Sequence, residues 1–368
     1  MLTEREYEIL GWIKEDPSIS QKEIAERANI SRSSVAVHIS NLTKKGAILG
    51  RRYMLADSAY VVVVGGANMD VAGKPDRALV SRDSNPGTVR MSPGGAGRNI
   101  AHNLALLGCD TRLVSAFGDD TRSRELRESC RAVGIDTSPS LVVPGGTTST
   151  YVFIMNEDGE MELAISDMKI FDELTPENLE RRLPLIDRAA LCVVDTNIPA
   201  ESLRYLAEHT TTPLFCDPVS TKKATKIDGI VGKFHTLKPN RIEAETLSHV
   251  HIHDDASLHR AAQTLLDTGL ERVFISLDQE GLLCADHEQM IKLPTLCHNV
   301  VNATGAGDTM MAAISWAFLE GEGLEASGVA GLAASAVCME ATTTINPKLS
   351  IEEVRRRMAA EEYRAVAI

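Results

Sequence analysis

Asn302-Ala303-Thr304-Gly305-Ala306-Gly307-Asp308 leads directly into an apolar run, Thr309-Met310-Met311-Ala312-Ala313-Ile314, which has the composition of a buried helix. Gly305 and Gly307 allow tight backbone geometry and the close approach of a ligand. The first amides of a helix have no partners within it, so they can bind an anion. Asp308 at the same place can accept a proton from a hydroxyl group held beside that anion. The segment therefore predicts phosphoryl transfer to an alcohol. An aspartate that merely caps a helix after a glycine turn is the alternative.

A second glycine-rich segment, Ser92-Pro93-Gly94-Gly95-Ala96-Gly97-Arg98-Asn99, lies about 200 residues upstream and also precedes a helical pattern, which Gly108 ends. In this order, the two segments resemble those of the PfkB/ribokinase family of carbohydrate and nucleoside kinases, and the resemblance runs from about Tyr60 to about Pro347. It implies a ribokinase-like three-layer α/β sandwich with a small β-sheet lid. It also implies ATP and Mg²⁺ as cofactors and a small-molecule nucleoside or sugar as substrate.

Composition excludes several other classes of protein. The chain has 368 residues, of which 43% are hydrophobic and 24% charged, as in ordinary globular proteins. No apolar run approaches the roughly 18 residues that span a bilayer, and the acidic, polar amino terminus does not have the pattern of a secretory signal. The seven cysteines show neither a CxxC pair nor a metal-ligand spacing. We therefore expect a cytoplasmic protein with reduced thiols and no membrane partner.

Charge divides the chain unevenly. Residues 1–57 carry nine Lys/Arg and eight Asp/Glu, so residues 58–368 carry the remaining net charge of −14. Phosphate contacts dominate affinity for nucleic acid, and so the acidic part is not expected to bind DNA by itself. We predict two domains, residues 1–57 and residues 58–368.

The first domain is predicted to be helical. Residues 4–15 have apolar side chains at helical spacing, and Ser20-Gln21-Lys22-Glu23 is a capping box that begins a second helix. Ser31 caps a third helix, from about Arg32 to Lys45, and residues 47–55 have the pattern of a small hairpin. This arrangement resembles the winged helix-turn-helix of bacterial transcription regulators.

That second resemblance implies a DNA-binding surface. The residues that would face the major groove are Arg32, Ser33, Ser34 and His38, and those near the phosphates are Lys44, Lys45, Arg51 and Arg52. A three-helix packing or dimerisation module without DNA contact is the alternative, because the net charge of this domain is only +1.

The pattern of the larger domain indicates a parallel sheet. Residues 60–64 are a continuous apolar run, as expected of a strand buried on both faces. Further apolar strands at 191–195, 213–217 and 272–277 alternate with helical patterns, which predicts right-handed crossovers. Ligands of such sheets bind at the carboxyl ends of the strands, where the glycine loops fall.

Residues from about 73 to 92 and from about 148 to 167 are expected to form the lid strands, with Asp158-Gly159 as a hairpin turn. By resemblance, the lid closes over the substrate, which excludes water that competes for the phosphoryl group. In the family such lids often pair two subunits and cover their exposed edges, so we expect a homodimer with a two-fold interface.

The resemblance assigns acceptor binding to two groups of residues. Asp70 would hydrogen-bond sugar hydroxyls, because an ionised carboxylate can accept from two neighbouring hydroxyl groups, although a turn aspartate is the alternative. The other acceptor-binding candidates are Asn68, Gly94, Gly95, Arg98, Asn99, Thr150 and Asp167.

Nucleotide binding is assigned to two further segments. Residues 238–245 resemble the family's Asn-x-x-Glu segment, in which Asn240 and Glu243 would address the phosphates and, through water, Mg²⁺. A solvated helix start is the alternative. Ser276 and Gly281 belong to a nucleotide loop in which Asp278 stands where glycine is common.

In the catalytic segment, Asp308 is the predicted base, and Gly305, Ala306 and Gly307 form the anion cradle. Asn302 replaces the aspartate with which the family usually begins this segment and with which some members hold a monovalent cation. Loss of that charge weakens such a site, so potassium dependence is not predicted.

Several segments look like the pseudouridine kinase branch of the family, in which ATP phosphorylates the 5′-hydroxyl of a C-linked nucleoside: residues 92–104, 148–151, 164–168, 217–220 and 302–308. Two alternatives remain. One is a sugar kinase of the ribokinase or fructokinase type, and the other is a transcription regulator whose kinase-like domain senses a sugar or nucleoside. The catalytic segments favour an enzyme, because a sensor needs no base.

Overall fold

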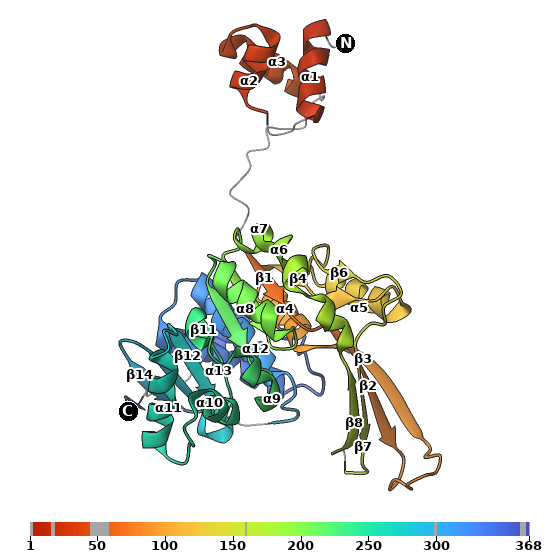
Figure 1. The fold of residues 1–368 in the computed structure, drawn as a ribbon, viewed down its shortest axis with the longest axis vertical. Helices are drawn as coiled ribbons and strands as arrows, with labels where there is room; N and C mark the ends of the chain where they lie inside the picture. Colours follow the sequence, from red (N-terminus) through yellow and green to blue (C-terminus); the bar gives the residue numbers. More distant parts are fainter. Residues whose placement is uncertain are drawn as a thin grey trace. The chain divides into compact units, whose positions relative to one another are not determined.

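The computed structural model describes residues 3–15, 19–44, 59–158, 160–297, 300–360 and 366–367. The chain forms two compact units, Met1–Ser58 and Ala59–Ile368 (Figure 1). In the part of the chain that is described, no helix is long and apolar enough to cross a membrane.

The described residues of the amino-terminal unit form three helices, α1 (Glu4–Glu15), α2 (Gln21–Ala28) and α3 (Arg32–Lys44). Ile9, Ile24, Val35 and Leu42 form the buried hydrophobic cluster of these helices. The predicted capping box at Ser20 and Glu23 is present, and its two hydrogen bonds measure 2.9 and 3.1 Å. Residues 47–55, for which the sequence predicts a hairpin, lie outside the described residues.

The larger unit is built on one sheet, whose described strands follow the order β15-β14-β13-β12-β11-β10-β9-β1-β4. The strands from β4 to β12 in this order pair in parallel, and those from β12 to β15 pair antiparallel. Their bounds are β1 (Tyr60–Val64), β4 (Asp110–Val114), β9 (Leu191–Asp195), β10 (Leu214–Asp217), β11 (Thr236–Leu237), β12 (Arg272–Ser276), β13 (Leu282–Asp286), β14 (Met290–Leu293) and β15 (Val366–Ala367).

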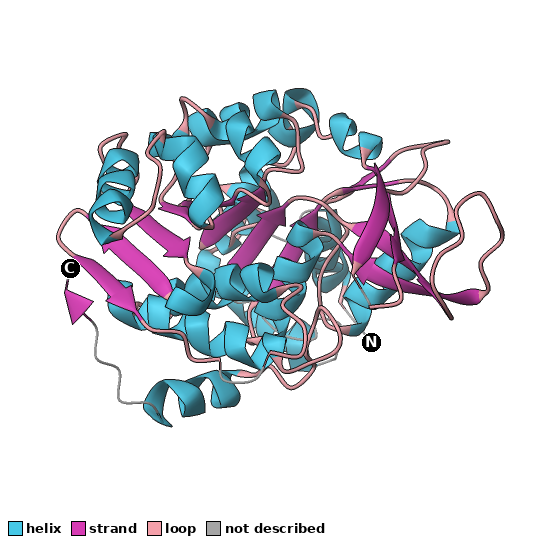
Figure 2. Ribbon diagram, turned by 90° about the horizontal axis from the view of Figure 1, so that it is seen from below, coloured by secondary structure: helices cyan, strands magenta, loops and turns pink. Residues whose placement is uncertain are grey.

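Helices cover both faces of this sheet (Figure 2). The α-helices are α4 (Ala96–Leu106), α5 (Thr121–Ala132), α6 (Pro176–Glu180), α7 (Leu183–Ile186), α8 (Ala200–His209), α9 (Thr221–Ala224), α10 (Arg241–Ser248), α11 (Asp255–Leu266), α12 (Ala306–Leu319), α13 (Leu324–Met339) and α14 (Ile351–Ala360). Short 3₁₀ turns lie at Lys169–Glu173, Thr225–Ile227, Val231–Lys233 and Asp278–Glu280.

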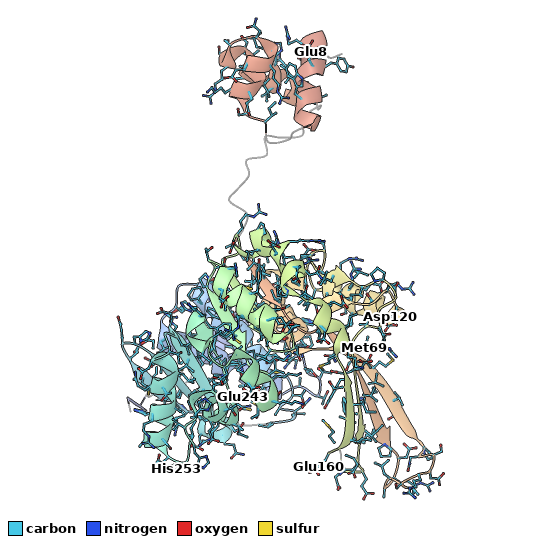
Figure 3. The ribbon with its side chains drawn as sticks, in the orientation of Figure 1. Glu8, Met69, Asp120, Glu160, Glu243 and His253 are labelled. Carbon is cyan, nitrogen blue, oxygen red and sulfur yellow. The ribbon has the colours of Figure 1, made fainter. Side chains whose placement is uncertain are left out.

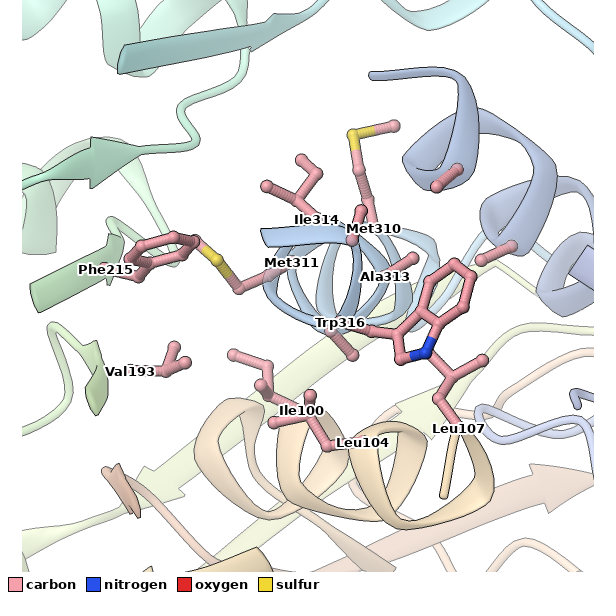
Figure 4. Close-up of a cluster of buried hydrophobic side chains, with 14 of the residues drawn as sticks. Ile100, Leu104, Leu107, Val193, Phe215, Met310, Met311, Ala313, Ile314 and Trp316 are labelled. Carbon is pink, nitrogen blue, oxygen red and sulfur yellow. The ribbon is translucent and has the colours of Figure 1, made fainter. Parts of the chain in front are cut away.

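Strand β1 is buried on both faces, which confirms the prediction from its continuous apolar run. Val61 and Val63 face one core, and Tyr60, Val62 and Val64 face the other. The first core joins the sheet to α4, α12 and α13. In Figure 4, Met311 of α12 lies beside Phe215 of β10, and Ile100 and Leu104 of α4 lie along another side of the same helix. The core thereby fixes the amino ends of α4 and α12, which follow the two glycine-rich segments. The expected three-layer α/β sandwich is confirmed.

A small second sheet has the strand order β3-β2-β7-β8. The bounds are β2 (Asn68–Pro75), β3 (Gly87–Gly94), β7 (Thr150–Met155) and β8 (Met161–Asp167), so its first strand begins earlier than the expected residue 73. A two-residue pair, β5 (Ala116–Phe117) and β6 (Leu141–Val142), lies apart from it. In Figure 3, Met69 marks the end of the small sheet at the main body, and Glu160 marks the far end.

One face of the small sheet is apolar and exposed. The pairing register places Met91, Val71, Val152 and Ile165 in one row across the sheet, and Val89, Gly73, Ile154 and Leu163 in the next. Val89, Leu163 and Ile165 expose 71%, 61% and 64% of their surface. Because side chains alternate along a strand, Asp70 and Tyr151 lie on the opposite face.

Candidate active site

The amino end of α12 has a backbone that only glycine adopts easily. Gly305 has a φ of 87°, and a Cβ atom there would lie 2.4 Å from the carbonyl oxygen of Thr344. The Thr309 N–H donates to the Gly305 carbonyl at 2.9 Å, so helical hydrogen bonding begins after the Gly307 and Asp308 amides. The predicted cradle also included Ala306, but its N–H donates to the carbonyl of Ala303 at 3.2 Å.

Asp308 lies half-buried in the first turn of this helix. The side-chain amide of Asn99 donates to its Oδ2 at 2.9 Å. Burial and the neighbouring charge of Asp217 raise the pKa of Asp308 to about 7. A carboxyl group with this pKa can both take and return a proton near neutral pH, which suits a general base.

The second glycine segment lies beside the start of β2. A Cβ atom at Gly94 would lie 2.2 Å from Oδ2 of Asp70, and one at Gly95, whose φ is 97°, would lie 2.5 Å from the carbonyl oxygen of Gly66. The side-chain amide of Asn68 donates to Oδ1 of Asp70 at 2.6 Å. The structure thus brings together Asn68, Asp70, Gly94 and Gly95, all predicted to bind the acceptor.

Asp195, at the carboxyl end of β9, joins the two glycine-rich turns that follow β1 and β3. Its Oδ2 accepts the N–H groups of Gly66 and Gly97 at 2.8 and 2.6 Å. The side chain is fully buried, and this burial raises its pKa. Sequence reasoning placed it at a strand end but gave it no role, although a carboxylate at that end of a parallel strand is itself a signal.

Arg98, which the sequence analysis predicts to bind the acceptor, is buried in the second glycine-rich segment. The guanidinium donates to the Pro93 carbonyl at 3.3 Å and to Oδ1 of Asn99 at 3.2 Å, and it lies 2.9 Å from Nδ1 of His102. Burial, with the charge of Arg98, lowers the pKa of His102 to about 4, which keeps that ring neutral. Arg98 therefore positions Asn99, which in turn contacts Asp308.

Thr150 and Asp167 pair directly across β7 and β8. Thr150 is buried, and its hydroxyl donates to the Thr148 carbonyl at 3.1 Å, whereas Asp167 is exposed. Asp120, which the sequence analysis did not single out, accepts the Thr148 hydroxyl at 2.6 Å and also caps α5 (Figure 3). It anchors the segment from which β7 starts.

Asn197 and Lys223 connect the end of the small sheet to the turn after β1, and sequence reasoning missed both. The ammonium group of Lys223 donates to Oδ1 of Asn197 at 2.5 Å and lies 3.7 Å from Sδ of Met168, the residue after β8. The side-chain nitrogen of Asn197 lies 2.9 Å from the position of a Cβ atom at Gly66. Burial lowers the pKa of Lys223. No local pattern in the sequence indicates this contact.

Asn240 and Glu243 form a capping box at the start of α10, with both hydrogen bonds at 2.9 Å. These two residues therefore begin a helix, as the alternative interpretation expects. The side chain of Glu243, however, is buried and not solvated. Burial, together with the charge of Asp217, raises the pKa of Glu243.

Lys238 and Asp217 form an ion pair of 3.2 Å, and each residue exposes only 4% of its surface. The ammonium group lies 3.4 Å from the position that a Cβ atom at Gly307 would take. Burial would lower the pKa of Lys238, but the charges of Asp217 and Glu243 raise it overall. This fixed cation beside the predicted anion cradle was not assigned from the sequence, although Lys238 lies two residues before Asn240 in the recognised segment.

The predicted nucleotide loop follows β12. The Ser276 N–H donates to the carbonyl of Pro239 at 3.0 Å, and Gly281 has a φ of 98°. Asp278 has a φ of 51°, in the left-handed region that favours glycine. The backbone thus explains why glycine is common at this position, and it shows that aspartate is accommodated here.

Asn302 forms its own side-chain contacts at the start of the catalytic segment. Its Oδ1 accepts the Thr304 N–H at 2.9 Å, and its Nδ2 donates to the Thr342 carbonyl at 3.4 Å. A neutral amide thus connects two backbone segments at this position.

The candidate DNA-facing residues lie along the front of α3, where Ser31 caps the helix through the Ser34 N–H at 3.1 Å. Arg32 and Ser33 are exposed, and Ser34 and His38 are half-buried. The side chain of Lys44 and all of Lys45, Arg51 and Arg52 lie outside the described residues.

Comparison with sequence families gives two matches. Residues 58–351 match the pfkB family of carbohydrate kinases, and residues 2–48 match a winged helix-turn-helix DNA-binding family. A sugar kinase of Escherichia coli K12, YeiI, which is described as uncharacterized, is 39% identical over 95% of this chain and 98% of its own length. The pseudouridine kinase of the same organism is 38% identical over 82% of this chain and 96% of its own length.

Solved structures agree with the fold. A carbohydrate kinase from Agrobacterium tumefaciens superimposes with a TM-score of 0.75 at 25% identity, covering 84% of this chain and all of its own. The ribokinase of Arabidopsis thaliana, in complex with ribose and ATP, superimposes with a TM-score of 0.73 at 21% identity over 83% of this chain and 100% of its own.

Proposed function

Because this chain belongs to the PfkB family of carbohydrate kinases, it is a phosphotransferase with an alcohol group as acceptor, and we propose that it phosphorylates the 5′-hydroxyl of pseudouridine with ATP as donor. The pseudouridine kinase relative supports this acceptor, since the likeness covers nearly all of that enzyme. A ribokinase- or fructokinase-type sugar kinase is the alternative.

The observation that carries the proposal is the position of Asp308. Its carboxyl group lies in the first turn of α12, accepts a hydrogen bond from Asn99, and has a pKa raised by burial to about 7. A base with this pKa beside free helix amides is suited to deprotonate an alcohol while the amides hold the transferred phosphate.

The proposed reaction is a direct in-line transfer. Asp308 takes the proton of the 5′-hydroxyl as its oxygen forms a bond to the γ-phosphorus, and the bond from that phosphorus to the bridging oxygen breaks so that ADP leaves. The amides of Gly307 and Asp308 and the ammonium of Lys238 stabilise the charge on the transferred oxygens. Asp70, oriented by Asn68, accepts hydrogen bonds from the ribose hydroxyls.

The residues near Lys238 fit a magnesium ion that is held mainly by phosphate and water. Asp217 and Glu243 are two buried carboxylates beside one buried lysine, and Oε2 of Glu243 is engaged by the Asn240 N–H. Among the described residues, no three acidic, histidine or cysteine side chains form a metal cage. Mg²⁺ commonly uses one or two carboxylates with substrate phosphates. When bound, it neutralises charge on the β- and γ-phosphates.

The test is ATP consumption by the full chain with pseudouridine, uridine, ribose and fructose. We expect turnover with pseudouridine, with the phosphate on the 5′-oxygen of the product. Turnover with free ribose or fructose and none with the nucleosides would replace the proposal with the sugar kinase alternative. Absence of turnover with any acceptor would favour the sensor alternative.

We also propose that the amino-terminal unit binds double-stranded DNA through the front of α3. The match of residues 2–48 to a DNA-binding family and the exposure of Arg32 and Ser33 support this role. A gel-shift experiment with the gene's own upstream DNA tests it. Arg32→Ala is expected to weaken binding, and Arg5→Ala on α1 serves as a control. Absence of a shift with the unsubstituted chain would favour a packing or dimerisation role.

A further inference from the structure

Two cavities adjoin beside the edge strand β4, away from the residues discussed above. One has a volume of about 420 Å³ and the other about 260 Å³, and Ser138 lines both. The segment of residues 134–141 contributes to both linings and runs along the outer edge of β4, where the Leu113 N–H donates to the Asp136 carbonyl at 2.9 Å. None of the lining residues has a part in the proposed phosphoryl transfer. Figure 1 shows α5 and β6 on this side of the sheet.

Two pairs of arginines line the cavities. Arg127 and Arg131, one turn apart on α5, line the smaller cavity, and Arg181 and Arg182, between α6 and α7, line the larger. Among the described residues, none of these four forms an ion pair, and Nε of Arg127 is buried without a hydrogen-bond partner.

Arg182 is held in a fixed orientation at the larger cavity. Its Nε donates to the Pro139 carbonyl and its Nη1 to the Asn178 carbonyl, each at 2.6 Å. Burial and then the positive charge of Arg181 lower the pKa of Arg182. Four guanidinium groups therefore line these cavities, one of them held in place, in a unit whose net charge is strongly negative.

The acidic group that lines these cavities is already engaged. Asp136 accepts the Ser138 N–H at 2.8 Å and the Ser138 hydroxyl at 3.0 Å. The cavities therefore combine four guanidinium groups and one carboxylate, a net positive set suited to phosphate, with an apolar wall formed by Pro139, Leu141 and Leu185. The volume of the larger cavity is in the range of sites for small organic molecules.

We propose that these adjoining cavities are a second ligand site, which binds the phosphate monoester of a small organic molecule. The guanidinium groups of Arg127, Arg131 and Arg181 contact the phosphate, and the apolar wall takes the organic part. The position beside β4 makes this a binding site separate from the kinase site, and the proposal does not depend on which acceptor the enzyme phosphorylates.

The experiment is isothermal titration of the full chain with inorganic phosphate and with uridine 5′-monophosphate, in the presence of saturating non-hydrolysable ATP analogue and Mg²⁺. The combined variant Arg131→Ala/Arg181→Ala removes two exposed side chains, so its melting temperature is expected to be unchanged. We expect its affinity for the monophosphate to fall by about tenfold or more, since charge-assisted hydrogen bonds are strong.

The matched control is Arg124→Ala, which removes an exposed arginine from the same helix outside the cavity. Its affinity should equal that of the unsubstituted chain. Equal affinity in the combined variant, or no saturable binding of either phosphate probe, would overturn the proposal. A titration with a duplex of random sequence forms the second arm. If the combined variant lost affinity for duplex DNA and kept it for the monophosphate, the arginines would form a surface for polyanions, and the small-molecule site would be refuted.

Discussion

The side-chain amide of Asn99 donates to Oδ2 of Asp308 over 2.9 Å, joining the first turn of α4 to the first turn of α12. Arg98 fixes the orientation of this amide by donating to its oxygen at 3.2 Å, which leaves the nitrogen toward Asp308. A donor to the carboxylate favours the ionised form, so Asn99 lowers the pKa of Asp308 against the larger effect of burial.

Asn99→Ala is therefore expected to shift the pH profile of turnover. Asp308 must be ionised to act as a base, and so the rate falls as the pH drops through its pKa of about 7. Loss of the donor raises that pKa further, and the acid limb moves to higher pH. The measurement is kcat as a function of pH. Asn103→Ala, which removes an amide that donates to Thr309 at 2.9 Å, is the control and should leave the limb in place. If the acid limb of the pH profile were unchanged in Asn99→Ala, Asn99 would not influence the pKa of the catalytic base.

Asp308→Asn is expected to keep ATP binding and to lower turnover by at least about 100-fold, because the amide cannot accept the proton of the hydroxyl group. Calorimetric titration with ATP measures the first quantity, and initial rates measure the second. Turnover near that of the unsubstituted enzyme would remove Asp308 from its proposed role.

Gly94→Ala tests the proposed acceptor site without altering a charge. The new Cβ atom would lie 2.2 Å from Oδ2 of Asp70, so the carboxylate must move. We expect kcat/KM for the acceptor to fall by about 100-fold, as for a misplaced binding group, with the KM for ATP unchanged. Gly323→Ala is the control, because no heavy atom lies within 4 Å of its Cβ position. If kcat/KM fell equally for the acceptor and for ATP, Asp70 would not be a group that binds the acceptor specifically.

The glycine loops and the strand of residues 60–64 could be predicted because local sequence determines them. Gly305 and Gly95 have positive φ values, and β1 is buried on both faces. Asp195 and Lys238 could not be assigned in this way. Asp195 joins two amides that lie 129 and 98 residues before it in the chain, and only the folded sheet brings these groups together. The arginines of the cavities beside β4 likewise come from separate elements.

Asn302 leads to a prediction about ions. Its amide bonds both the Thr304 N–H and the Thr342 carbonyl, and it carries no charge to attract a cation. Turnover is expected to be the same in potassium and in tetramethylammonium chloride at equal ionic strength. Activation by potassium but not by the larger cation would show that the site functions without the carboxylate.

The apolar face of the small sheet leads to the last prediction, a homodimer formed through this face. Two cross-strand rows of apolar side chains, including Leu163 and Ile165, are exposed in the single chain, and such patches usually mark an interface. The same sheet has β3 and β8 at its edges, which a second copy would cover. Leu163→Lys/Ile165→Lys would place two charges in such an interface and should separate the subunits.

Light scattering after size exclusion measures the mass directly. The unsubstituted chain is expected at twice its 39.9 kDa and the double variant at the single-chain mass. Glu162→Lys is the matched control, because its side chain lies on the opposite face of the same strand and its change of charge should leave the dimer intact. If the unsubstituted chain has the single-chain mass, the exposed rows are not a self-association surface. If the dimer survives in the double variant, the subunits pair through another part of the chain.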